Sequence, residues 1–446
     1  MIDLHKQTDT PVDLTERPIG EVCVGTPPFP QGLEYCAPAR GHWTIAHTPM
    51  LIPGSYMIYL CASACMRGVV LSVLEYEGMD RFSMVILKDE DIYEGNLEQV
   101  MIDGICEIID GLKEHPPIVM PFTSCIHHFL ACDTTYIYEV LRSRYPDIDF
   151  VECFMIPTIR KGHITPEELM QVNLYDALEE GLEKDRSVNL IGCNYPADPE
   201  DDYCRLLLAA GYRLRNLPAM ETYQEYKDMA RSEANLYTAP VARFSARKLE
   251  KRLNQQDLYL PAVCTFSEIR QALTELADTL QIPLPDLDAM QAEAEAAAAK
   301  ARKLLGDTPI ALDHEVIPRF CSMARMLTEL GFHVTDLYSD YVLPEEQEDL
   351  DWLKEHVPEL VFHATSGYAC RMEENIKRPE PERKILAIGQ KAAYFTGTAH
   401  FVNMLEYNGL WGFHGIVRLM ELMMEAYEQK SNVPEIISVK AWGCHA

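Results

Sequence analysis

The chain has 446 residues, enough for two or three domains, and 48% of them are hydrophobic, as in ordinary globular cores. It carries 39 Lys and Arg residues against 69 Asp and Glu residues, a net charge of -30. That charge repels phosphate backbones and anionic lipids, so the composition argues against nucleic acids and membrane surfaces as partners.

Residues 1–20 form a polar N-terminal arm that lacks the apolar segment of an export signal. The chain also contains 14 cysteines, and so many thiols without an export signal indicate a reducing compartment. We therefore expect a cytoplasmic protein.

Residues 50–74 are the least polar long stretch, and they have the length of a membrane span. Pro53 and Gly54 interrupt the stretch near its start, and Arg67 lies in its second half. We interpret it as a buried loop followed by a helix, not as a membrane segment.

Short apolar or β-branched runs recur along the rest of the chain, with helical patterns between them. Most runs lack the polar–apolar alternation of half-buried strands, which is typical of parallel strands covered on both faces. The alternation of strands and helices predicts an α/β fold with parallel sheets flanked by helices. The predicted strands are Phe82–Leu87, Ile118–Phe122, Phe150–Ile156, Val188–Cys193, Tyr212–Leu217, Asn235–Thr238, Leu258–Val263, Pro309–Asp313, His333–Leu337, Leu360–Ala364 and Lys384–Gly389. The clearest helical patterns are Leu97–Leu112, Thr134–Tyr145 and Ser267–Thr279.

The number of strands exceeds what one ordinary doubly wound sheet holds, so we predict three Rossmann-like domains. The Ala- and Glu-rich helical stretch 289–305 is interpreted as a connector that precedes the third domain. A helical pattern at Gly415–Glu428 predicts a C-terminal helix that packs back on the body. The predicted domains after the arm are 21–185, 186–306 and 307–446.

Two nucleotide-binding motifs are absent from the sequence: the phosphate loop GxxxxGKS/T and the dinucleotide turn GxGxxG. Three cysteines stand out in the first third, namely Cys36 in a loop, Cys61 in the apolar segment and Cys125 after a predicted strand. Thiolates from separate loops are suitable ligands for an iron–sulfur cluster. Their spacing alone is weak evidence for a cluster and is also that of buried core thiols, because three of 14 cysteines can be chosen in many ways.

Sparse motifs follow one another in a fixed order beyond residue 20: Pro53–Ser55, Asp91–Leu97, Pro121–Cys125 followed by Asp133, Asn189–Gly192, Met326–Phe332 and Glu406–Gly415. Together they resemble the nitrogenase component 1 family, which includes nitrogenase subunits, light-independent protochlorophyllide reductases and cofactor-assembly scaffold proteins. The resemblance covers nearly the whole chain beyond the arm.

The resemblance implies that Cys36, Cys61 and Cys125 bind an iron–sulfur cluster at the interface with a homologous subunit, in a homodimer or a heterotetramer. The cluster is either a four-iron, four-sulfur cluster or a larger one similar to the P-cluster. Cys65 is the substitute for Cys61, because the Pro53–Ser55 turn lies farther from Cys61 than the family pattern has it. The resemblance also implies an oxygen-free setting and electrons from a separate ATP-hydrolysing iron protein.

Two positions depart from the nitrogenase branch of this family. Ala239 stands where that branch has a cofactor-binding Cys, and Asn403 lies near the position of its cofactor-binding His, with His400 three residues away. The departures argue against a dinitrogen-reducing α chain, and they leave a second metallocluster and its type open.

The expected function is therefore a reductase subunit that passes electrons from its cluster to a bound small-molecule substrate. His127, His128, His400 and His414 are candidate proton donors, and each is alternatively a surface or core side chain. Three other functions stay open: a scaffold for assembly of an iron–sulfur cofactor, a non-catalytic partner subunit, and a soluble α/β binding protein without metal.

Overall fold

The computed structural model describes residues 15–30, 46–75, 77–156, 164–367, 370, 383–405 and 410–433. The strands within these residues form three sheets, and the chain divides into two compact units. One unit contains the first two sheets, and the other contains the third. Among the helices described, none is both long and apolar enough to cross a membrane.

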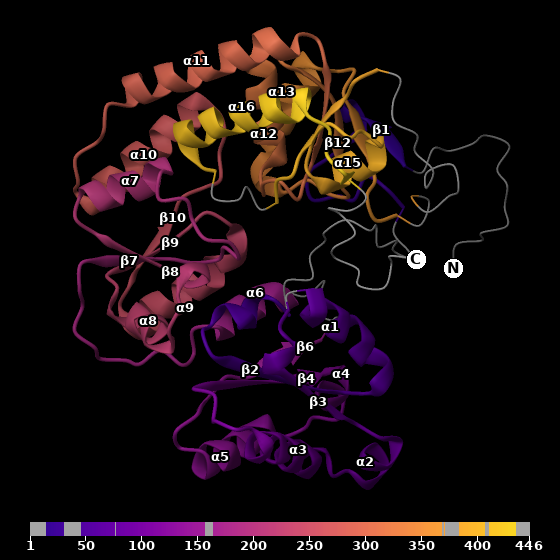
Figure 1. Cartoon of the computed structure of the whole chain (residues 1–446), viewed down its shortest axis with the longest axis vertical. Helices are drawn as coiled ribbons and strands as arrows, with labels where there is room; N and C mark the ends of the chain where they lie inside the picture. The colour runs from indigo at the N-terminus through magenta and orange to yellow at the C-terminus, as the bar shows by residue number, and fades with distance from the viewer. Residues whose placement is uncertain are drawn as a thin grey trace, which may run out of the picture. The chain divides into compact units, whose positions relative to one another are not determined.

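The first sheet consists of parallel strands in the order β3-β2-β4-β5, with β6 also paired to β4. Helices α3 and α5 cover one face of this sheet and α1 and α6 cover the other (Figure 1). Its strands are β2 (Ser55–Cys61), β3 (Phe82–Ile86), β4 (Ile118–Ser124), β5 (Asp149–Phe150) and β6 (Cys153–Met155). Its helices are α1 (Ser63–Glu75), α2 (Asp89–Glu94), α3 (Leu97–Gly111), α4 (Cys125–Phe129), α5 (Thr134–Arg144) and α6 (Pro166–Asn173).

Strand β2 is buried along its whole length. Ile58 and Leu60 join an apolar cluster with residues of α3 and α5, whereas Met57, Tyr59 and Cys61 join the cluster on the opposite face. Because each face of the sheet has its own layer of helices, both sets of alternating side chains are apolar.

The second sheet is also parallel, in the order β10-β9-β7-β8. Side chains of α9 join the same apolar cluster as Met57 and Tyr59 of the first sheet, so the two sheets share a core. The strands are β7 (Ser187–Leu190), β8 (Arg213–Asn216), β9 (Ala234–Tyr237) and β10 (Gln256–Tyr259), and the helices are α7 (Asp202–Ala209), α8 (Tyr223–Asp228) and α9 (Arg243–Leu253).

The third sheet has the order β1-β13-β12-β11-β14-β15, and its strands are parallel except β1, which pairs antiparallel with β13. Helices α11 and α16 lie side by side in this unit (Figure 1). Its strands are β1 (Glu16–Pro18), β11 (Pro309–Asp313), β12 (His333–Tyr338), β13 (Val361–His363), β14 (Leu386–Ile388) and β15 (Phe401–Val402). The helices of this part are α10 (Phe266–Leu280), α11 (Leu287–Leu305), α12 (Phe320–Glu329), α13 (Gln347–His356), α15 (Gln390–Thr396) and α16 (Gly412–Glu428).

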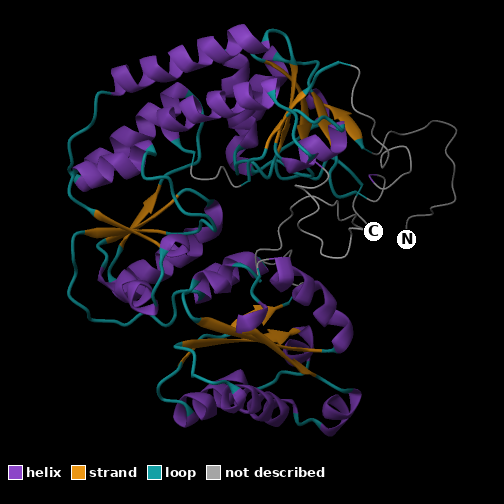
Figure 2. Cartoon of the chain, in the orientation of Figure 1, coloured by secondary structure: helices purple, strands orange, loops and turns teal. Residues whose placement is uncertain are grey.

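The predicted fold class is confirmed, because parallel sheets flanked by helices account for all three sheets (Figure 2). The C-terminal helix packs against α11, as expected for a helix that returns to the body. The interpretation of residues 50–74 is wrong in its first half, where β2 replaces the expected loop. The domain boundaries at 185/186 and 306/307 stay predictions.

Candidate functional site

The order of strands reverses once in each of the three sheets. In the first sheet β2 lies between β3 and β4, which both come later in the chain. In the same way β7 lies between β8 and β9 in the second sheet, and β11 lies between β12 and β14 in the third. In open α/β sheets such switch points leave a crevice at the carboxyl ends of the two diverging strands, and ligands bind there. The residues after these strands are therefore the first place to look for a functional site.

Two cysteines lie at the switch point of the first sheet. Cys61 is the last residue of β2, and Cys125 directly follows the end of β4. Because Leu60 of β2 pairs in register with Thr123 of β4, the two strand ends lie next to each other. The sequence places both thiols after apolar runs, and the parallel pairing of β2 with β4 brings those run ends to one edge.

The Cys61 side chain is fully buried. Burial, together with the charges of the neighbouring Cys65 and Cys125 thiolates, raises the pKa of its thiol to about 12. Cys65 lies exposed in the first turn of α1, and Cys125 is half-buried at the first residue of α4. Three thiols thus gather around the end of β2, and two of them are within reach of solvent or a ligand.

These thiols fit an iron–sulfur cluster only in part. Cys36, the third predicted ligand, lies outside the described residues. Within the part of the chain that the structure describes, no group of three His, Cys, Asp or Glu side chains is arranged to hold a metal ion. The donor type suits iron and sulfide, because thiolates are the usual ligands of such clusters. The ligand set Cys36, Cys61 and Cys125 stays a prediction.

His127 supplies a second observation at the same edge. Its ring is buried, and Nδ1 accepts a hydrogen bond from the backbone N–H of Ser124 at 3.2 Å. The ring proton is therefore assigned to Nε2, which has no hydrogen-bond partner among the described residues. Burial lowers the pKa of His127, so the ring is a neutral N–H donor. A buried donor without a partner, two residues from Cys125, is what a bound group would satisfy.

The other histidine candidates have different surroundings. His128 is exposed on α4, whereas His400 and His414 belong to the unit of the third sheet. His400 is buried, and its Nδ1 donates to the carbonyl oxygen of Ala426 at 2.9 Å, which ties the β14–β15 connection to α16. His414 is half-buried on α16. Their role as proton donors stays a prediction.

The positions that depart from the nitrogenase branch lie at or near the other two switch points. Ala239 lies two residues after the end of β9, and Ala242, three residues further on, packs against the turn after β7, where Gly192 has a φ of 80° and a Cβ would overlap that of Ala242. Asn403 is exposed after β15, and its Oδ1 accepts a hydrogen bond from Gln390 Nε2 at 2.9 Å. The Asn403 side chain is thus engaged with the first residue of α15.

The switch point of the third sheet carries a group of charged residues that the sequence motifs did not indicate. Asp313 ends β11, and His314 and Glu315 follow it. Lys391, at the start of α15, is mostly buried, and its Nζ lies 2.7 Å from Glu315 Oε1. His314 Nε2 lies 3.4 Å from the same oxygen. The signal available in the sequence was an acidic pair, Asp313 and Glu315, directly after a predicted buried strand.

Burial and the neighbouring charges together set the pKa values of this group. Burial raises the pKa of Asp313 to about 6, although its carboxylate accepts a hydrogen bond from the Ala392 N–H at 2.8 Å. Burial lowers the pKa of Lys391, but the effect of Glu315 outweighs it and the pKa ends above its ordinary value. The site therefore holds one charged lysine and one carboxyl that exchanges its proton near neutral pH.

Comparison with known proteins gives a consistent result. The family model of nitrogenase component 1 type oxidoreductases matches residues 60–428. No curated protein matches the chain significantly. A solved structure titled "Nitrogenase Cp1 at pH 6.5" is 14% identical with a TM-score of 0.67, covering 90% of this chain and 94% of that chain. A second, "Nitrogenase Cp1 at pH 5", is also 14% identical, with a TM-score of 0.54 and 92% and 94% coverage. Both share the fold with this chain.

Proposed function

The chain belongs to the nitrogenase component 1 type oxidoreductases, and we propose that it is a reductase subunit that holds an iron–sulfur cluster and delivers electrons to a small-molecule substrate. The observation that carries the proposal is the meeting of Cys61 and Cys125 at the switch point between β2 and β4. A family whose members typically bind iron–sulfur clusters has soft donors here, where α/β sheets bind ligands.

In this proposal Cys36, Cys61 and Cys125 bind the cluster, with Cys65 as the substitute for Cys61. A bound iron–sulfur cluster supplies one-electron transfer. The chain's own residues shape its surroundings: the buried end of β2 keeps water from Cys61, and His127 offers a neutral N–H beside Cys125. Hydrogen-bond donors next to the ligands of a metal site generally orient those ligands and change the redox potential of the metal.

The proposed function requires two protein partners, an iron protein and a homologous subunit. The sequence has no phosphate-loop motif, so an ATP-coupled electron supply requires a separate ATP-hydrolysing iron protein. The proposed cluster lies at an interface with a homologous subunit, which makes the assembly a homodimer or a heterotetramer. A reducing cytoplasm suits a chain with 14 cysteines.

The substrate site is proposed at the third switch point, where protons are available. Asp313 retains its proton up to about pH 6, and Lys391 remains charged beside Glu315. Both groups can donate protons to a substrate that receives electrons. Ala239 and Asn403 supply neither a thiol nor an imidazole, so we propose that the substrate is not dinitrogen.

One observation favours a second function. With Ala239 and Asn403 in place of metal-ligating residues, the chain would release a large cofactor more readily than hold it. A scaffold for cofactor assembly, or a non-catalytic partner subunit, has the same thiols at the first switch point but no substrate turnover.

Iron and acid-labile sulfide per chain, measured together with an EPR spectrum on protein purified without oxygen, test the proposal. We expect several irons per chain in the wild type and the loss of most of them in Cys61→Ala and Cys125→Ala. Cys106→Ala is the matched control, because Cys106 is buried in α3 on the opposite face of the sheet. Unchanged iron in Cys125→Ala, with a native circular dichroism spectrum, would refute the cysteine assignment. A cluster that is reducible but supports no substrate turnover would favour the scaffold.

A further inference from the structure

Helix α9 concentrates positive charge in a strongly acidic chain. Its 11 residues include five cations, whereas the whole chain has a net charge of -30. The cations form two rows at i, i+4 spacing: Arg243, Arg247 and Lys251 in one row, and Lys248 and Arg252 in the other. Like charges at this spacing destabilise a helix, so helix stability does not explain the arrangement.

The second row is neutralised by the chain itself. Lys248 Nζ lies 2.5 Å and Arg252 Nη1 3.3 Å from Asp176 Oδ1. Arg252 also donates to the carbonyl oxygen of Tyr175 at 2.6 Å, and Glu180 lies 4.0 Å from its Nε. These contacts fasten α9 to the segment after α6, which gives this row a structural role.

The first row differs, because none of the described residues neutralises it in this way. Arg243, Arg247 and Lys251 are exposed, and no carboxylate of the described residues forms an ion pair with them within 4 Å. The Arg243 guanidinium lies 5.0 Å from the centroid of the Phe244 ring. Arg247 affects a neighbouring side chain electrostatically: its charge lowers the pKa of Tyr237, whereas the charge of Asp257 raises that pKa. Exposed cations of this row are therefore available to a ligand.

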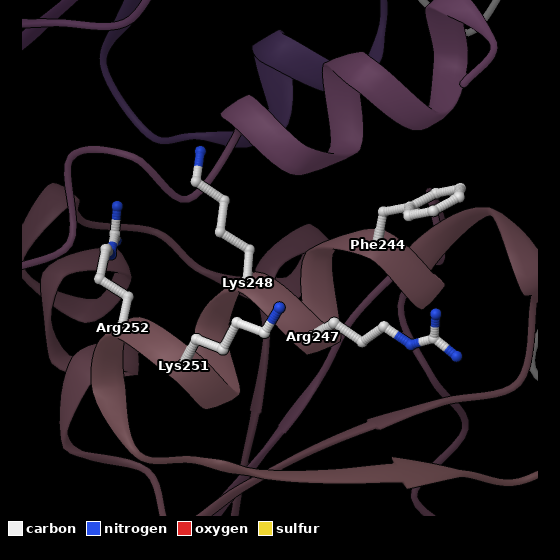
Figure 3. Close-up of a pocket in the computed structure, with 5 residues that line it drawn as sticks. All are labelled: Phe244, Arg247, Lys248, Lys251 and Arg252. Carbon is white, nitrogen blue, oxygen red and sulfur yellow. The ribbon is translucent and has the colours of Figure 1, made fainter. Parts of the chain in front are cut away.

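The two rows enclose a pocket on the surface of α9. Phe244, Arg247, Lys248, Lys251 and Arg252 line it, and Figure 3 shows these side chains projecting from one stretch of the helix. Four of the five lining residues are cationic, against the two carboxylates, Asp176 and Glu180, that contact them. The lining of this shallow pocket therefore keeps a surplus of positive charge.

We propose that this pocket binds a small multivalent oxyanion, a compound with two or more phosphate or carboxylate groups. Guanidinium groups bind such oxygens in pairs, and lysines add point charges that balance the second anionic group. The site does not involve the cysteines or Asp313, so it stands independently of the reductase proposal.

Titration calorimetry on the full chain, with pyrophosphate, citrate and sulfate as separate probes, tests the proposal. We expect one site for pyrophosphate or citrate that binds at least about tenfold more tightly than sulfate, because charge-assisted hydrogen bonds to a second anionic group each add affinity. Tighter pyrophosphate identifies a phosphate ligand, and tighter citrate identifies a carboxylate ligand.

Three variants give the test its controls. The double variant Arg247→Gln/Lys251→Gln is expected to weaken binding at least about tenfold, since it removes two exposed charges without touching the Asp176 contacts. Arg247→Lys/Lys251→Arg, which keeps both charges, should retain most of the affinity and shows that the surface tolerates substitution. Lys300→Gln removes an exposed cation on α11 and should leave binding unchanged.

Three outcomes would overturn the proposal: equal affinity for all three anions, no binding by the wild type, or wild-type affinity in Arg247→Gln/Lys251→Gln.

Discussion

Glu346 shows how strongly a single buried residue departs from its ordinary chemistry. Its side chain has no exposed surface, and its carboxyl accepts hydrogen bonds from the N–H groups of Cys321 at 2.7 Å and Leu343 at 3.4 Å. Burial raises the pKa of Glu346 to about 8, although both N–H groups and Arg319 act in the opposite direction. The group is therefore protonated at neutral pH.

The raised pKa of Glu346 makes folding stability fall as pH rises. Between its ordinary pKa and about pH 8 the folded chain holds a proton that the unfolded chain has lost, which costs about 1.4 kcal/mol per pH unit. Glu346→Gln keeps an acceptor for the Cys321 N–H and removes the titration. We expect its free energy of unfolding to fall less steeply than that of the wild type between about pH 5 and pH 8.

Denaturant unfolding at three pH values across that window measures the slope. Parallel pH profiles for Glu346→Gln and the wild type would contradict the assignment of a protonated Glu346.

For single residues, the sequence indicated which residue types matter but not their protonation states. Cys61 and Cys125 were identifiable because each follows an apolar run, although only Cys125 was expected to follow a strand. The raised pKa values of Asp313 and Glu346 were not predictable, because they depend on burial by segments far away in sequence. Desolvation is a property of the packed molecule.

Among the elements, β2 was missed and its neighbours were found. Every side chain of β2 is apolar or small, so the strand shows no alternation, and it directly follows Pro53 and Gly54, which favoured the interpretation as a loop. The segment forms a strand because β3 and β4 pair with it through hydrogen bonds on both of its edges. Helices such as α3 and α5 were predicted within one residue of their ends, because their exposed faces preserve a helical period.

The turn between β14 and α15 gives a test at this scale. Gly389 has a φ of 103°, and a Cβ there would overlap the carboxylate of Asp313. Gly389→Ala is expected to lower the free energy of unfolding by about 1–3 kcal/mol, through both backbone strain and displacement of Asp313. Urea unfolding measures the loss.

Gly111→Ala is the matched control, because Gly111 ends α3 with open space around it. It should be neutral or stabilising. A loss in Gly111→Ala as large as in Gly389→Ala would argue against an effect of the Asp313 contact.

For the whole molecule, the net charge of -30 is the dominant long-range feature. The excess of 69 carboxylates over 39 cations repels itself across the folded surface, and the denatured chain relieves that repulsion by expanding. Dissolved salt shortens the range of the repulsion to about 10 Å at 0.1 M. Salt should therefore favour the folded state.

We expect the Tm at neutral pH to rise when NaCl increases from about 20 mM to about 200 mM, because screening weakens the repulsion among carboxylates. Differential scanning calorimetry measures the shift. The same series near pH 5, where protonation has reduced the net charge, should show a smaller rise. A Tm that falls with salt at neutral pH would mean that attractive ion pairs, such as those of Arg319 and Arg325 with Asp349, outweigh the repulsion.

The sequence by itself determined the α/β class, the positions of most strands and of several helices, and the placement of Cys125 directly after a strand. These features depend on local periodicity and on residue type, which are present in any short window of the chain. The tertiary structure decided which strands are neighbours, and with them the three switch points. Only the packed molecule brings Cys61 beside Cys125, buries Asp313 against α15 and leaves one row of α9 cations without an ion pair to any carboxylate in the described part of the chain. These outcomes depend on contacts between segments distant in sequence, which no local pattern encodes.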